Sequence, residues 1–213
     1  MSLNHTELSN EHINFIDNQN IFFVGTISEN GHINLSPKGQ DSIRVINSST
    51  IVWRNLTGSG NKSFSHILNN PRMSMMFCAF NGTPLILRIC GQARALHRND
   101  LEWSKYIDLF SHNIDSRQIF IFDISQVESS DGLSVPLFSY QGNRDYSDYW
   151  SQHQHRKDIE GAKSKKNQRN MDDLKTDLIK QACIRENASL NIKSMNLLLP
   201  LRSFLKEFVI KPR

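Results

Sequence analysis

Short apolar runs separated by turn sequences fill most of the chain up to Ser125, and they limit the fold more than any other feature. Each run has the length of a strand, and Gly, Pro or Asn lies between most of them. The runs are Ile21–Ile27, His32–Ser36, Ser42–Ile46, Thr50–Arg54, Arg72–Phe80, Leu85–Leu96 and Ile119–Ser125. Within this part of the chain, helical spacing is confined to Leu8–Asp17, Phe64–Leu68 and Leu101–Phe110. Many short strands with few helices between them predict a mainly β (α+β) antiparallel barrel rather than a parallel sheet.

Local turn and cap signals add detail to this prediction. Asn30-Gly31 is the strongest short hairpin signal in the chain, because both residue types tolerate positive φ. Gly91 interrupts the long run Leu85–Leu96, so we expect a bulge or a close backbone approach there. Either Ser9 or Asn10 is placed to cap the first helix.

A glycine-rich stretch, Asn55–Ser63, joins a predicted strand to a predicted helix. Its two glycines allow the backbone to curl so that successive N–H groups point inward, which forms a nest suited to an anion. The helix that follows adds unpaired N–H groups and the positive end of its dipole. Lys62 adds a full charge, and the hydroxyls are those of Thr57, Ser59 and Ser63. Phosphate is the anion that this combination favours.

A simpler interpretation of the same stretch is an ordinary strand-to-helix loop. Asn61 would then cap the helix, and Lys62 would lie on the surface. The stretch matches neither G-x-x-x-x-G-K-[ST] nor G-x-G-x-x-G. Spacing alone therefore leaves the phosphate site and the plain loop open.

Composition is that of an ordinary soluble globular protein, with 38% hydrophobic and 22% charged residues. No apolar stretch approaches the roughly 20 residues of a transmembrane helix, and we see no secretory signal at the N-terminus. The three cysteines, Cys78, Cys90 and Cys183, are far apart, which favours buried reduced thiols over disulfides. We therefore expect a cytoplasmic protein that is also compatible with the nucleus. No His or Cys cluster has zinc spacing, so we predict no metal site.

The net charge of +4 is local. His155–Arg169 holds six basic and two acidic residues, which equals the charge of the whole chain. The remainder is neutral, so we expect neither nucleic acid nor a membrane as a partner.

The character of the chain changes after Trp150. Residues 151–170 are polar and basic without apolar periodicity, which predicts a linker. Residues 171–213 contain two apolar stripes at helical spacing, Met171, Leu174, Leu178 and Ala182, then Leu201, Phe204, Leu205 and Phe208. We therefore predict a barrel domain over 1–150, a linker over 151–170 and a helical C-terminal extension over 171–213.

Several motifs in order resemble the pyridoxamine 5'-phosphate oxidase-like FMN-binding split barrels. The first signature of this family resembles Gly31–Gly39. Its second signature resembles four segments in order: Leu56–Asn61, His66-Ile67, Asn70–Arg72 and Met76–Phe80. The closing segment of one subgroup resembles Val135–Phe138, Tyr140–Gly142 and Arg144-Asp145. The resemblance covers the chain from Asn20 to Tyr149.

This resemblance implies a six-stranded antiparallel split β-barrel that forms a homodimer, with FMN bound between the subunits. Hydroxyls and basic residues of the turn before the helix would hold the flavin phosphate, and the matching positions are Thr57, Ser59 and Lys62. Ser36 and Lys38 end the hairpin strand that faces the flavin in relatives, so they are the next cofactor-binding candidates. Arg44, Arg54 and Arg88 are weaker candidates, since an arginine in a strand often points to solvent.

The chain departs from the enzymes of this family that oxidise pyridoxamine phosphate. Those enzymes carry an arginine-rich strand and a C-terminal Arg-Leu-x-Pro segment, where this chain has Asn34–Lys38 and Val209–Arg213. A glutamine that they place near the flavin ring falls at Ile86. We therefore predict a flavin-dependent oxidoreductase with an unknown small-molecule substrate, not the vitamin B6 oxidase itself.

No acid–base pair can be assigned from the sequence, because the histidines in the barrel region are isolated. Two alternatives to an oxidoreductase stay open. One is a non-catalytic dimeric split barrel that binds flavin, haem or another planar ligand. The other is an interaction module that uses the basic C-terminal region.

Overall fold

The computed structural model describes residues 3–29, 31–56, 61–111 and 116–144. The predicted linker over 151–170, the predicted helical extension over 171–213, and the loop residues Thr57 and Ser59 lie outside the described residues. Within the described part, no helix is long and apolar enough to cross a membrane.

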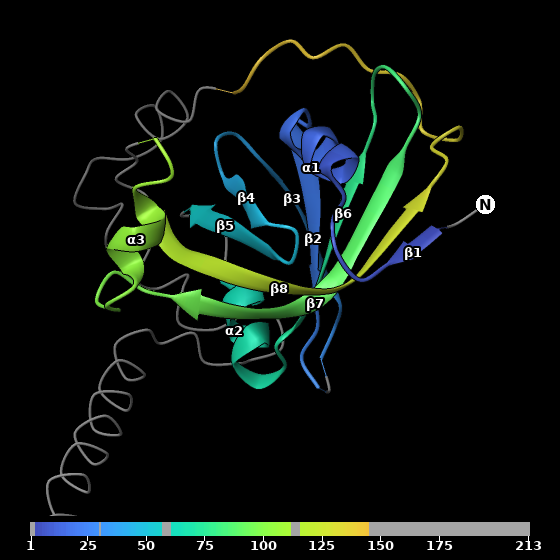
Figure 1. Cartoon of the computed structure of the whole chain (residues 1–213). Coiled ribbons are helices and arrows are strands. Elements are labelled where there is room, and N and C mark those ends of the chain that lie inside the picture. Colours follow the sequence, from blue (N-terminus) through green and yellow to red (C-terminus); the bar gives the residue numbers. More distant parts are fainter. Residues whose placement is uncertain (1–2, 30, 57–60, 112–115, 145–213) are drawn as a thin grey trace, which may run out of the picture. The chain divides into compact units, whose positions relative to one another are not determined.

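Eight strands and three helices follow one another along the described chain (Figure 1). In chain order they are β1 Leu3–His5, α1 Asn10–Asp17, β2 Ile21–Thr26, β3 Asn34–Gly39, β4 Ile43–Asn47, β5 Thr50–Leu56, α2 Lys62–Asn69, β6 Arg72–Cys78, β7 Ile86–Leu96, α3 Trp103–Ile107 and β8 Ser116–Ser130.

All strand pairs are antiparallel, and the sheet order is β3-β2-β6-β7-β8-β5-β4, with β1 added on β8. The long strands β7 and β8 curl the sheet into a half-barrel, with α1 and α2 at opposite ends (Figure 1). The mainly β, split-barrel fold is thus confirmed. The sheet has eight strands rather than six, partly because the short strand β1 pairs with the end of the 15-residue strand β8.

The two edge strands, β3 and β4, are joined by the short link from Gly39 to Ile43. The Ser42 hydroxyl donates to the carbonyl of Gly39 at 2.7 Å, and the Ser42 carbonyl accepts from the backbone N–H of Arg54 at 2.7 Å. This link therefore brings β3 across to the side of the sheet that holds β5.

The bulge predicted at Gly91 is confirmed. The register of β7 and β8 shifts between Cys90 and Gly91. A Cβ atom at Gly91 would overlap the carbonyl oxygen of Asp123, so the backbones approach too closely for any side chain. The predicted hairpin is also confirmed, because β2 pairs with β3, although the connection is longer than an Asn-Gly turn and Asn30 lies outside the described residues.

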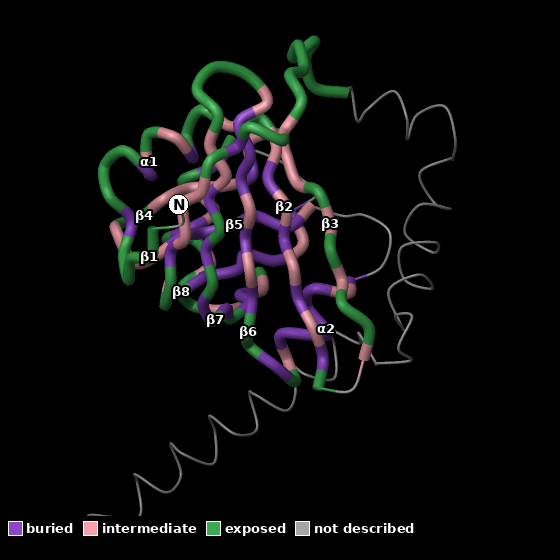
Figure 2. Tube along the Cα trace, turned by 90° about the vertical axis from the view of Figure 1, so that its right-hand side faces the viewer, coloured by how far each residue is buried: buried purple, intermediate pink, exposed green. Residues whose placement is uncertain are grey.

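The core fills the concave side of the sheet. The Trp53 and Phe120 rings stack with centroids 4.6 Å apart, and Phe22 stacks on Phe77 at 5.6 Å. Burial is concentrated on the central strands, whereas β3 is largely exposed or half-buried (Figure 2). Complete burial of an aromatic side chain stabilises a fold by about 1.5–3 kcal/mol, so these stacked pairs contribute strongly to the core.

The helices α1 and α3 can be compared with the helices predicted from the sequence. Ser9, one of the two residues predicted to cap the first helix, caps α1, because its hydroxyl accepts a hydrogen bond from the backbone N–H of His12. The third predicted helix is shorter than expected, because only Trp103–Ile107 is helical. It packs on the outer face of β5, β7 and β8, where Val52, Leu96, Tyr106, Phe110, Ile119 and Ile121 form a second apolar cluster.

The prediction of buried, reduced cysteines holds for one of the two cysteines that the structure describes, and Cys183 lies outside the described residues. Cys78 is buried, and burial raises the pKa of its thiol. Cys90 is exposed, because it alternates with the buried residues Ile89 and Gly91 along β7 and therefore lies on the outer face.

Candidate functional site

Three of the predicted cofactor-binding residues lie within the described chain. Lys62 is the first residue of α2, and Ser36 and Lys38 lie on β3. Thr57 and Ser59 belong to the undescribed loop that joins β5 to α2. The geometry of this region therefore comes from β3, from the end of β5 and from the start of α2.

Residues of β3 alternate between the barrel interior and the outside. Asn34, Ser36 and Lys38 stand directly opposite Thr26, Val24 and Phe22 of β2. Those three β2 residues are buried, and directly opposed residues share one face of a sheet. The side chains of Asn34, Ser36 and Lys38 therefore form an inward row. The Ser36 hydroxyl is buried and has no hydrogen-bond partner within the described part of the chain.

Lys38 crosses from β3 toward β5. Its Nζ atom lies 5.2 Å from the centroid of the Trp53 ring, which is a cation–π contact. Burial lowers the pKa of the Lys38 ammonium, and the charge of Arg117 lowers it further. A partly desolvated ammonium beside a second cation is stabilised by an anion.

Polar side chains fill the corner between β5, β8 and α2. Asn55 Nδ2 donates to Gln118 Oε1 at 2.9 Å and to Asn61 Oδ1 at 3.5 Å. Gln118 is 0% exposed and Asn61 is 2% exposed. Asn55 and Gln118 are directly opposite, next to the stacked pair Trp53 and Phe120. We call Trp53, Asn55, Asn61 and Gln118 the donor corner.

The donor corner contains three buried N–H donors without a partner among the described residues. They are Trp53 Nε1, Asn61 Nδ2 and Gln118 Nε2. A buried donor left unpaired costs about 1–3 kcal/mol, so native proteins rarely tolerate three together without a ligand or water. All three groups donate and none accepts, so they suit an acceptor-rich group.

The start of α2 has a related property. Asn61 stands at the N-cap position, but its side chain makes no capping hydrogen bond. The interpretation of Asn61 as an ordinary helix cap is therefore not supported, since its amide is engaged by Asn55 instead. The first-turn N–H groups of α2 consequently receive no side-chain cap from Asn61.

The side chains that surround this helix start are tied together. Asn34 Nδ2 lies 3.2 Å from Thr26 Oγ1 and 3.2 Å from Ser63 Oγ. Thr26 Oγ1 also lies 3.2 Å from Nδ1 of His66, which is 1% exposed. His66 is thus a buried residue of the helix rather than a solvent-exposed one. This network connects β2 and β3 to the first turns of α2.

Arg44, Arg54 and Arg88 lie away from the donor corner. Arg54, 2% exposed, donates to the carbonyls of Ser111 and Asp41. Arg44 and Arg54 both lie over the Phe110 ring, on the outer face that carries α3. Arg88 pairs with Glu128 at 3.6 Å on the outer face of β7 and β8.

Sequence reasoning missed the donor corner. Asn55 and Asn61 stand in the glycine-rich stretch, where Asn61 was considered only as a helix cap and Asn55 was given no role. Gln118 precedes the predicted strand Ile119–Ser125. The strand β8 begins three residues earlier, at Ser116. A polar residue inside a buried strand is the signal that would have identified Gln118.

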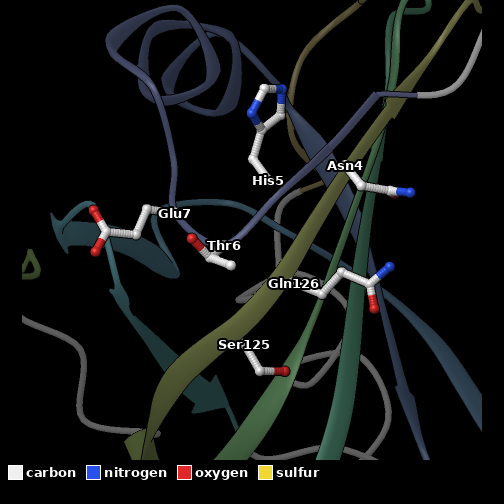
Figure 3. Close-up of a pocket in the computed structure, with 6 residues that line it drawn as sticks. All are labelled: Asn4, His5, Thr6, Glu7, Ser125 and Gln126. Carbon is white, nitrogen blue, oxygen red and sulfur yellow. The ribbon is translucent and has the colours of Figure 1, made fainter.

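Two other features do not coincide with this region. A pocket of about 640 Å³ lies between the N-terminal segment and β8, lined by Asn4, His5, Thr6, Glu7, Ser125 and Gln126 (Figure 3). Its six lining side chains are all exposed, and none of the predicted site residues is among them. The described residues also contain no group of His, Cys, Asp or Glu side chains arranged for a metal ion.

Comparison with known proteins places the chain in context. It is 35% identical over 124 residues to the pyridoxamine 5'-phosphate oxidase family protein ustO of Aspergillus flavus, which corresponds to 56% of this chain and 50% of ustO. The chain thus spans about half the length of this curated relative.

Solved structures of low identity resemble the fold. A candidate pyridoxamine 5'-phosphate oxidase of Lactobacillus delbrueckii has 19% identity and a TM-score of 0.48, covering 59% of this chain and 97% of that one. A pyridoxamine 5'-phosphate oxidase-related, FMN-binding protein of Nostoc punctiforme has 12% identity and a TM-score of 0.42, covering 53% and 74%. These scores are low, so the fold assignment rests on the strand order described above.

A family profile supplies the decisive match. The profile described as pyridoxamine 5'-phosphate oxidase matches residues 8–131, which is more than half of the chain and spans α1 to the end of β8. The chain therefore belongs to the pyridoxamine 5'-phosphate oxidase family.

Proposed function

We propose that this protein binds FMN and acts as a flavin-dependent oxidoreductase on a small molecule other than pyridoxamine phosphate. The observation that carries the proposal is the group of three unpartnered, buried N–H donors in the donor corner, next to an α2 start that Asn61 does not cap. Membership of the family supports the same cofactor.

The residues at this place suit the phosphate of FMN. Lys62 brings a positive charge to the first position of α2, where the helix dipole also favours an anion. Thr57 and Ser59, in the adjoining loop, are proposed to supply hydroxyl donors. A phosphate has only acceptor oxygens, so it complements a donor-only environment.

The rest of the flavin is proposed to lie along β3. Ser36 offers a buried hydroxyl with no partner among the described residues, and Lys38 offers a partly desolvated ammonium. Both groups favour a ligand that carries acceptor atoms or negative charge. When bound, FMN supplies the electron-transfer chemistry, while the protein supplies binding, orientation and electrostatics.

Departures from the family's vitamin B6 oxidases argue against pyridoxamine phosphate as the substrate. The inward row of β3 offers Asn34, Ser36 and Lys38 in place of arginines. Ile86, where the family's oxidases carry a glutamine, is the first residue of β7 and has no polar side-chain atom. In the family's vitamin B6 oxidases, the arginine-rich strand and the glutamine contact the flavin, and the C-terminal Arg-Leu-x-Pro segment serves the substrate. This chain has Val209–Arg213 in place of that segment, so it lacks the groups that would orient that substrate.

We also propose that the protein is a homodimer. Two large apolar side chains are exposed at the edge strand β3. Ile33, just before the strand, is 75% exposed, and Leu35, on its outward face, is 65% exposed. Neighbouring apolar side chains of this size on one face are typical of a protein–protein interface.

Visible absorbance of the purified protein tests the cofactor. The protein is mixed with FMN, excess FMN is removed by gel filtration, and flavin per chain is measured. We expect the unsubstituted protein to retain flavin. Lys62→Ala should lower the affinity for FMN about tenfold, because a charge-assisted contact to the phosphate is lost. Lys105→Ala is the matched control, since Lys105 lies on α3 against Tyr106. No retention by the unsubstituted protein would refute the proposal.

A further inference from the structure

We propose that Ser63 is a further ligand contact, donating its hydroxyl proton to the phosphate at the start of α2, and that Asn34 positions it. This inference rests on the proposed FMN function. The glycine-rich stretch offered the Ser63 hydroxyl as one of three candidate donors to a phosphate, whereas no sequence pattern connected Asn34 with it. The proposal follows from the hydrogen bonds that these two residues make and from their place in the fold.

Ser63 stands at the right position on the helix. It is the second residue of α2, directly after Lys62, and it is 7% exposed. A side chain in the first turn of a helix lies beside the unpaired N–H groups, where an anion binds. A hydroxyl at this position contributes to an anion site only if its proton is available.

The contact with Asn34 leaves that proton available. Asn34 Nδ2 lies 3.2 Å from Ser63 Oγ, and an amide nitrogen can only donate a hydrogen bond. Ser63 Oγ therefore accepts from Asn34. A hydroxyl has one proton and two acceptor lone pairs, so accepting this bond keeps the proton for a different acceptor.

Asn34 also fixes the direction of the Ser63 hydroxyl. Its amide is held on the other side by Thr26 Oγ1 at 3.2 Å, and Thr26 is 3% exposed. Thr26 in turn contacts Nδ1 of the buried His66, which lies one turn further along α2. The amide thus connects the inward row of β3, which carries Ser36 and Lys38, to the helix that carries Lys62. We infer that Asn34 holds the two halves of the cofactor site in register.

The test compares FMN with riboflavin, which has the same ring system and no phosphate. Dissociation constants for both are measured by quenching of flavin fluorescence. Ser63→Ala should weaken FMN about tenfold and leave riboflavin unchanged, because only the phosphate contact is lost. Ser63→Thr keeps the hydroxyl and should restore most of the affinity. Asn34→Leu should weaken FMN by about three- to tenfold, again without an effect on riboflavin.

The double variant separates positioning from direct contact. If Asn34 acts through Ser63, the Asn34→Leu/Ser63→Ala pair should bind FMN no more weakly than Ser63→Ala alone. Asn69→Ala is the matched control, because Asn69 Nδ2 donates to the Ser65 carbonyl at 3.0 Å at the opposite end of α2. It removes a similar hydrogen bond from the same helix and should change neither ligand.

The outcomes are distinct. Equal weakening of FMN and riboflavin by Asn34→Leu, or multiplying effects in the double variant, would overturn this inference while the proposed function stands. Retention of wild-type FMN affinity by Ser63→Ala would overturn it as well. If the unsubstituted protein retains no FMN, the proposed function fails, and this inference fails with it.

Discussion

Gly91 gives the sharpest test of the fold, because the structure predicts opposite signs for one substitution at two glycines. A Cβ at Gly91 would overlap the carbonyl oxygen of Asp123 and lie 3.0 Å from its carbonyl carbon and 3.1 Å from Ile124 Cα. All three atoms are backbone, so no flexible side chain can move aside. A Cβ at Gly25 would meet Ser74 O at 3.7 Å and Leu35 Cδ1 at 4.0 Å, which are ordinary contacts.

The magnitude follows from what must move. Overpacking a tight site costs about 1–3 kcal/mol. At Gly91 the backbone of β8 must also shift, which weakens a ladder hydrogen bond worth about 1 kcal/mol. We therefore expect Gly91→Ala to lower the free energy of unfolding by about 3 kcal/mol. Gly25→Ala should raise it by about 0.4–1 kcal/mol, because the unfolded chain loses backbone freedom.

Urea unfolding followed by tryptophan fluorescence, to which the buried Trp53 contributes, measures both variants. With a slope of about 2 kcal/mol per molar urea, the Gly91→Ala midpoint should fall by about 1.5 M, while the Gly25→Ala midpoint should rise slightly. Equal midpoints for Gly91→Ala and the unsubstituted protein would refute the close approach and, with it, the register of β7 on β8.

Two further predictions concern pH and assembly. Burial and the charge of His5 lower the pKa of His12 in the folded chain, against an opposing effect of Glu11, and His12 Nδ1 accepts from the Ser9 N–H. The unfolded chain therefore binds the proton first, so stability should fall as pH drops from about 7 through the unfolded pKa of about 6.5 toward the folded pKa. His12→Gln should lose less stability between pH 7.5 and 5.5 in urea titrations, and an equal loss would contradict this. Leu35→Lys should convert the proposed dimer to a monomer, because it places a charge on the exposed face of β3. Light scattering after gel filtration measures the mass, and a monomeric unsubstituted protein would rule the dimer out.

Most of the secondary structure could be predicted from local patterns. Apolar runs with turn residues between them located the strands, since period and turn chemistry depend on neighbours in sequence. The bulge at Gly91 and the cap at Ser9 were predicted for the same reason. The third helix was overestimated, because Leu101 and Phe110 are apolar at helical spacing although only Trp103–Ile107 is helical. In the fold, Phe110 packs with the cluster beneath α3 from outside the helix.

The candidate site was predictable only in part. The glycine-rich stretch directed attention to Lys62 and to the start of α2 because all its groups are close in sequence. Strand membership alone left the three arginines undecided. Which face a strand residue takes depends on the register with its partner, and the register turned Arg54 outward to Phe110 while Trp53 and Asn55 point inward.

The sequence by itself therefore determined the class of fold and drew attention to one candidate anion-binding segment, since both follow from short-range spacing and backbone chemistry. Only the tertiary structure decided that Gln118 stands opposite Asn55, that Lys38 reaches across to Trp53, and that Asn34 contacts Ser63. These residues are separated by 15 to 63 positions, and the sheet register and the closing link between β3 and β4 bring them together. Long-range convergence of this kind is set by how the whole sheet curls, which no local pattern encodes.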